Sequence, residues 1–102
     1  MPTTTVFKRF DLAEHLKTEE EIADYLEAAG KENDAALMVK ALGTVARARN
    51  MAQLARESDI TREGLYKALS PDGNPSFATV SKIAKALGFR LAIVPISEAP
   101  SS

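Results

Sequence analysis

The stretch LARESDITREGLYKALS, residues 54–70, predicts two short helices joined by a tight turn. Asp59 falls in the turn, and a small apolar residue is expected where the two helices cross closely. The residues that fill the gap beneath the turn then set the angle between the helices. These positions are Leu54, Ala55, Ile60 and Leu65.

This spacing is typical of a helix-turn-helix, whose second helix, here residues 61–69, stands out from the body. Thr61 is expected to cap that helix, so its first turn presents free N–H groups and positive dipole potential. A projecting helix of this width fits the major groove of B-DNA. The side chains facing base edges or flanking phosphates would be Arg62, Glu63, Tyr66 and Lys67. A plain helical hairpin within a bundle is the alternative.

Two residues of the stretch depart from the usual motif. The turn normally holds a left-handed glycine, whereas this chain has Asp59, a residue type that tolerates the left-handed region better than most. Gly64, inside the second helix, costs about 1 kcal/mol relative to alanine. It either allows close approach of the backbone to DNA or has no role.

Composition excludes several classes of protein. The chain has 102 residues, enough for one domain, and no cysteine, so it has neither disulfides nor a thiolate metal site. With one histidine, His15, and no glycine-rich phosphate loop, we expect no enzyme, no metal and no cofactor. No apolar run approaches the roughly 18 residues of a membrane helix. We therefore expect a soluble, cytoplasmic protein.

The formal net charge of −1 hides an asymmetry between the two parts of the chain. Residues 1–34 carry nine acids and four bases, whereas residues 35–102 carry nine bases and five acids. Faces of opposite sign suggest two kinds of partner, one polyanionic and one basic. Alternatively, the acidic residues only complement helix N-termini.

Hydrophobic spacing and capping residues predict five helices. Thr18 and Glu21 form a capping box for a helix ended by Gly30, and Asn33 is expected to cap the next. Residues 51–58 and 61–69 follow. Ser76 caps the last helix, which ends at Gly88 and buries an apolar stripe of Phe77, Val80, Ile83, Ala84 and Leu87.

The two ends of the chain have β-forming composition. Residues 89–94 predict a strand, with Phe89, Leu91 and Ile93 on one face. Residues 1–17 allow a short strand over residues 4–9 and a helical turn capped by Asp11. We expect one domain, divided into an arm (1–17), an acidic helix (18–34), a helix-turn-helix unit (35–88), a C-terminal strand (89–96) and a frayed tail (97–102).

Residues 35–88 resemble the Xre/Cro-type helix-turn-helix domain. Over nearly the whole chain, the pieces ARARNM, LYKALSPDGNP and KALGF make the sequence similar to the HigA-like probable addiction module antidote proteins. The resemblance implies a mostly α, five-helix lambda-repressor-like bundle with a short C-terminal strand. It also implies a bacterial antitoxin that binds a basic RelE/HigB-type toxin and, as a dimer, represses its own operator.

The resemblance also assigns residues. Beyond the four outward side chains of residues 61–69, Gln53 would contact phosphate, and Asn74 and Ser76 would make a second backbone contact. Turn and cap chemistry explains the last two equally well, and Tyr66 is as suited to packing on Leu69 as to touching DNA. An acidic helix face would meet the toxin, unless it is simply solvated. Its residues are Glu19, Glu20, Asp24 and Glu27.

A homodimer is expected because one short helix-turn-helix makes few base contacts, and two copies on a palindromic site double them. A lone strand needs a partner, so Phe89, Leu91 and Ile93 are the expected dimer interface, with the segment near Val6 as the alternative partner. Two other functions compete with the antitoxin: a DNA-binding repressor without a toxin partner, and an interaction module that has lost DNA binding.

Overall fold

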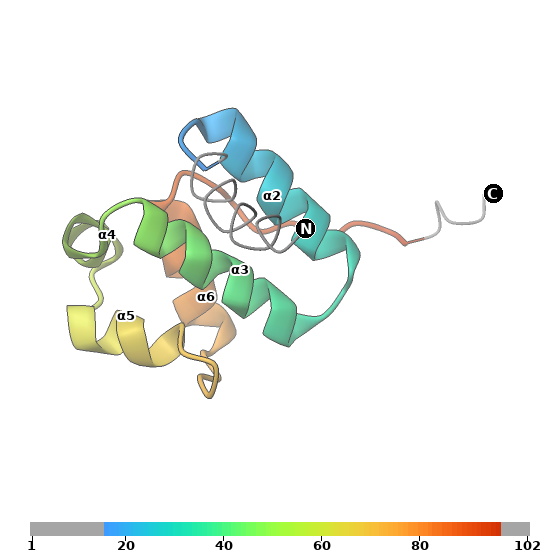
Figure 1. Ribbon diagram of the computed structural model, residues 1–102. Helices are drawn as coiled ribbons and strands as arrows, with labels where there is room; N and C mark the ends of the chain where they lie inside the picture. Colours follow the sequence, from blue (N-terminus) through green and yellow to red (C-terminus); the bar gives the residue numbers. More distant parts are fainter. Residues whose placement is uncertain (1–15, 97–102) are drawn as a thin grey trace, which may run out of the picture.

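The computed structural model describes residues 16–96, and these residues form five helices (Figure 1). The described part of the chain is therefore mostly helical, as predicted. The predicted strand over residues 4–9, His15 and the tail from residue 97 lie outside the described residues. The helices are α2 (Glu19–Lys31), α3 (Ala35–Ala48), α4 (Met51–Ser58), α5 (Arg62–Ala68) and α6 (Phe77–Ala86).

Side-chain caps start the helices where the sequence predicts them. Thr18 accepts a hydrogen bond from the Glu21 amide at 3.1 Å, and the Glu21 carboxylate accepts one from the Thr18 amide at 3.2 Å, which completes the capping box. Thr61 Oγ1 accepts from the Gly64 amide at 3.0 Å, and Ser76 Oγ accepts from the Thr79 amide at 3.1 Å. The predicted starts of α2, α5 and α6 are confirmed.

The connection between α2 and α3 differs from the prediction by one or two residues. Helix α2 continues through Gly30 to Lys31, and Asn33 adopts a left-handed conformation with φ of 53°. Asp34, not Asn33, caps α3: its Oδ1 accepts from the amides of the second and third residues of that helix, at 3.0 and 3.3 Å. Asparagine tolerates the left-handed region, which leaves the neighbouring carboxylate to cap the helix.

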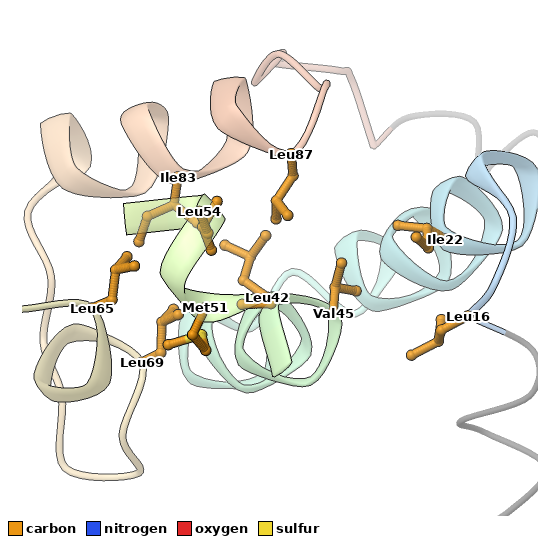
Figure 2. Close-up of a cluster of buried hydrophobic side chains, with 11 residues drawn as sticks. Leu16, Ile22, Leu42, Val45, Met51, Leu54, Leu65, Leu69, Ile83 and Leu87 are labelled. Atoms are coloured by element: carbon orange, nitrogen blue, oxygen red, sulfur yellow. The ribbon is translucent and has the colours of Figure 1, made fainter. Parts of the chain in front are cut away.

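The core lies where α4 meets three other helices. Helix α4 packs against α3, α5 and α6, while α2 packs on α3 (Figure 1). Figure 2 shows side chains from these helices pointing toward one another, with Leu65 of α5 beside Leu54 and Ile83. Ile22 of α2 extends the core across α3. The buried cluster comprises Leu16, Ile22, Leu42, Val45, Ala46, Met51, Leu54, Leu65, Leu69, Ile83 and Leu87.

The prediction that Phe77 belongs to the buried stripe of α6 is wrong. Its side chain is 76% exposed, whereas Ile83 is fully buried and Val80 is partly buried. Burial increases along α6, because the first turn of the helix projects beyond the core. Apolar periodicity reports the face of a helix, but it does not report where along its length the core begins.

The predicted C-terminal strand is also not found. Residues 89–96 contain no strand, and no strand occurs elsewhere in the described residues 16–96. A strand requires a neighbouring backbone to complete its hydrogen bonds, and no described segment lies beside this one in a ladder. The predicted end of α6 is confirmed, since Gly88 has φ of 97° and Phe89 then packs against the core.

The turn after α5 holds a glycine that no other residue can replace without a backbone shift. A Cβ built on Gly73 would lie 2.6 Å from the Lys67 carbonyl oxygen and closer still to the carbonyl oxygen of Ala68. These neighbours are backbone atoms at the end of α5, so they cannot rotate away. The close approach of this turn therefore fixes the C-terminal end of α5.

Replacing Gly73 by alanine is expected to lower the free energy of unfolding by about 1–3 kcal/mol, because the added methyl group overpacks a backbone contact. Gly30→Ala is the matched control: a Cβ there meets only Met38 Cε at 3.5 Å, and the substitution favours the helix by up to about 1 kcal/mol. Chemical denaturation of both variants tests this pair. Equal effects of the two substitutions would contradict the close approach at residue 73.

Candidate nucleic-acid interface

The turn between α4 and α5 has the geometry that the sequence predicts. Asp59 has φ of 64° and ψ of 31°, the left-handed conformation, and its amide donates to the Ala55 carbonyl. The Ile60 amide donates to the same oxygen at 3.3 Å. These bonds end α4 and redirect the chain within three residues, so α5 starts immediately at the Thr61 cap.

Helix α5 is held from beneath by apolar side chains. Leu65 is fully buried and Leu69, at its end, is 5% exposed. Ile60, in the turn, is partly buried and packs against the same core. Since these contacts come from one side of a seven-residue helix, they fix its orientation and leave its other side outward. Figure 1 shows α5 at the edge of the molecule, far from α2.

The outward side of α5 carries the side chains predicted to bind. Arg62, Glu63 and Lys67 are exposed, and Thr61 is exposed at the cap. Tyr66 is 48% exposed and is not among the residues that pack against the core, so it faces solvent. Within residues 16–96, neither Arg62 nor Lys67 forms an ion pair. Two cations are therefore available to a polyanion on one short helix.

Gly64 has a structural explanation that the sequence alone does not provide. A Cβ at this position would lie 3.1 Å from Ile60 Cγ2 and 3.1 Å from Thr61 Oγ1. The glycine thus lets the first turn of α5 sit close to the turn that precedes it. Tight packing of the turn is thus one reason for a glycine here, and close approach of the backbone to DNA stays a prediction.

The other predicted DNA contacts lie on elements that flank α5. Gln53 is exposed on α4, and its Nε2 donates to Glu57 Oε2 at 3.0 Å. Asn74 is exposed in the turn before α6. Ser76 is exposed and caps α6, so the cap role predicted for it is confirmed, while the DNA role stays a prediction.

A second exposed surface, which we call the acidic face, lies on α2. It consists of Glu19, Glu20, Asp24 and Glu27, all exposed and within about 140° of the helix circumference. Ile22 is buried on the opposite side, against α3.

One member of the acidic face, Glu19, has an ion-pair partner that the sequence does not predict. Arg49 Nη2 lies 3.4 Å from Glu19 Oε2, which joins α2 to the end of α3. The sequence gives no local signal for this pair, because the two residues are thirty positions apart. Both side chains are exposed, so the pair contributes at most about 1 kcal/mol.

The described residues hold no group of histidine, cysteine, aspartate and glutamate side chains suited to a metal ion. Within residues 16–96, every helix is too short or too polar to cross a bilayer. The described residues thus define a class of small helical domain, in which a capped helix is presented outward on one side and a separate acidic face lies on α2, away from it (Figure 1).

The chain belongs to the family of probable addiction module antidote proteins, whose model matches residues 6–95. It is similar to an uncharacterized protein of Haemophilus influenzae, with 54% identity over 90 residues that cover 88% of this chain and 93% of the relative. No solved structure matches the chain. Membership of the family indicates an antitoxin role and a toxin partner, and it favours binding over catalysis.

Proposed function

We propose that this antitoxin neutralises a RelE/HigB-type toxin by direct binding and represses its own operon through an Xre-type, lambda-repressor-like helix-turn-helix. The observation that carries the DNA-binding part is α5 itself. It is fixed by buried leucines on one side and presents two unpaired cations, Arg62 and Lys67, on the other.

In the proposed complex, α5 enters the major groove and α4 lies across the backbone. Arg62 and Lys67 contact guanine edges or phosphates, and Glu63 is suited to accept from a cytosine amino group. Tyr66 contacts a base or a sugar from the same surface. Gln53 on α4 and the pair Asn74 and Ser76 before α6 contact the phosphate backbone on either side, which sets the register of α5.

The protein acts on DNA as a homodimer in this proposal. One α5 reads only a few base pairs, and two copies related by a two-fold axis read a palindromic site. The half-sites are then expected about 34–36 Å apart, which is one turn of the duplex. The C-terminal segment with Phe89, Leu91 and Ile93 is the proposed contact between the copies.

The acidic face of α2 is the proposed contact with the toxin. A ribonuclease of the RelE/HigB type has a cationic surface for RNA, and an exposed row of carboxylates complements it. This face lies on α2, away from α5, so the proposal places the two partners on different sides of the protein (Figure 1). Family membership supports an antitoxin over a repressor without a toxin partner.

Two measurements test the proposed function. Co-expression with the product of the adjacent gene, followed by size-exclusion chromatography, is expected to yield a stable complex. Titration of labelled DNA from upstream of the gene, at two salt concentrations, is expected to show specific binding that weakens steeply with salt. Absence of any DNA binding at low salt would reject the repressor function and leave the toxin complex as the sole activity.

Reversing charge on the acidic face is expected to weaken the toxin complex by about 10- to 100-fold at low salt, since like charges then oppose each other. The variant is Asp24→Lys with Glu27→Lys, and the loss is expected to shrink as salt rises. Glu57→Lys with Asp72→Lys, which changes the net charge equally on other exposed elements, is the control. If both variants lose the same affinity for the toxin, the effect comes from net charge alone, and a specific site on α2 is contradicted.

A further inference from the structure

The C-terminal segment, residues 89–96, leaves the core without a backbone partner. The Phe89 amide donates to the Ala84 carbonyl at 2.8 Å, and beyond it no backbone hydrogen bond joins residues 90–96 to the rest of the described chain. The segment is also apolar and exposed: Ile93 is 102% exposed, and Val94 and Ile96 are 70% and 71% exposed. Unpaired backbone and exposed apolar side chains occur together here, a combination typical of an edge awaiting a partner.

Side chains at alternate positions of the C-terminal segment form an apolar face that begins at the core. In an extended chain, Phe89, Leu91 and Ile93 share one face. Phe89 packs against the buried cluster, Leu91 is 38% exposed, and Ile93 is fully exposed. This face therefore continues the hydrophobic core outward, one side chain at a time, to a position where nothing described covers it.

We propose that this segment pairs with the same segment of a second copy, in an antiparallel ladder centred on Leu91. The inference rests on the homodimer of the proposed function and adds the register that joins the copies. Leu91 then lies opposite Leu91 of the second copy, and Ile93 lies opposite Phe89. Each exposed isoleucine is thereby placed at the edge of the other copy's core, and the ladder satisfies the unpaired N–H and C=O groups of both segments.

The position of the charged residue and of the proline in the segment favours a second copy as the partner and a ladder centred on Leu91. Arg90 is the only charged residue between positions 86 and 97, and in the ladder it lies opposite Ala92 rather than opposite itself. Pro95, which cannot donate to a ladder, stays outside the five paired residues. Centring on Ala92 would bring Pro95 opposite Phe89. The segment has no carboxylate, so it offers a basic toxin no complementary charge.

The register is testable by single cysteines, because the natural chain has none. In Leu91→Cys the two thiols face each other across the ladder at a separation that a disulfide can bridge, and mild oxidation is expected to yield a covalent dimer. In Ile93→Cys the two thiols are displaced by four residues along the ladder, roughly 13 Å, and no covalent dimer is expected. Both variants are oxidised without DNA or toxin and compared on non-reducing gels.

A further variant tests the pairing of the two segments without forming a disulfide. Ile93→Asp is expected to raise the dimer dissociation constant by at least about 100-fold, since each copy would bury an uncompensated carboxylate. Its thermal midpoint at monomeric concentrations should be unchanged, because Ile93 is fully exposed in the single chain. Ala78→Asp, on the exposed first turn of α6, is the control.

Light scattering that shows a monomer at every concentration overturns the inference, as does an Ile93→Cys dimer that forms as readily as the Leu91→Cys dimer. A monomeric protein also results if residues 1–15 of the same chain cover the segment. Titration with operator DNA separates failure of the ladder from failure of the proposed function. A dimer that ignores the operator leaves the ladder intact and rejects repression, whereas a monomer that binds the operator rejects the ladder and the homodimer but leaves operator binding intact.

Discussion

Arg62→Ala is expected to weaken binding of the operator by about 10- to 100-fold and to leave the thermal unfolding midpoint unchanged. The guanidinium is exposed on α5 and has no ion-pair partner in residues 16–96, so its removal costs the fold little. In a groove, a bidentate contact to guanine or a contact to phosphate is worth about 1–3 kcal/mol. Electrophoretic mobility shifts and fluorescence anisotropy measure the loss.

The salt dependence separates the two kinds of contact that α5 is proposed to make. If Lys67 neutralises a phosphate, Lys67→Ala is expected to reduce the slope of log affinity against log salt by about 1 and to weaken all DNA sequences alike. Lys31→Ala removes the same charge from α2, at the far side of the molecule, and is the matched control. If Lys31→Ala weakens binding as much as either α5 variant, DNA does not lie along α5.

Leu65→Ala is expected to lower the free energy of unfolding by about 2–5 kcal/mol, because Leu65 is fully buried where α5 meets α4 and α6. For a domain of this size, the thermal midpoint should fall by roughly 10 °C or more. Operator affinity should fall as well, since α5 loses the contact that orients it. Calorimetry together with DNA titration below the new midpoint records both effects.

Tyr66→Ala provides the neighbouring comparison on the same helix. Tyr66 is 48% exposed and lies outside the core, so the free energy of unfolding should change by no more than about 0.5 kcal/mol. Operator affinity is nevertheless expected to fall. Should Tyr66→Ala destabilise the protein as much as Leu65→Ala, the assignment of one inward and one outward side to α5 would be wrong.

The parts of the fold that sequence predicts well are those that local chemistry determines. The capping box at Thr18, the cap at Thr61 and the left-handed turn at Asp59 each depend on residues within four positions. The bounds of α4 match the prediction for the same reason. Burial of Leu54 and Leu65 follows from helical spacing alone.

The parts that were missed depend on what lies elsewhere in space. The exposure of Phe77 reflects where the core ends, and the pairing of Arg49 with Glu19 joins residues thirty positions apart. The prediction of a strand at residues 89–94 was wrong, because β-forming residues give only a propensity, whereas a ladder needs a second backbone. The swap of roles between Asn33 and Asp34 turns on two adjacent residues that both favour caps.

The candidate site likewise has features that the sequence predicts and features that appear only in the folded protein. Its inward residues and caps were predictable, and the exposure of its outward side chains is as expected. The reason for Gly64 was not, because the crowding by Ile60 and Thr61 appears only once the turn is folded.

The two-sided construction of α5 bears on how such modules diverge. Stability depends on Leu65 and Leu69, whereas the proposed operator preference depends on Arg62, Glu63, Tyr66 and Lys67, and the two sets share no member. On this proposal, a duplicated copy is free to change its outward residues without unfolding. Sister modules in one genome would thereby become insulated from each other's promoters, and exchanging those four side chains between relatives should exchange the genes they silence.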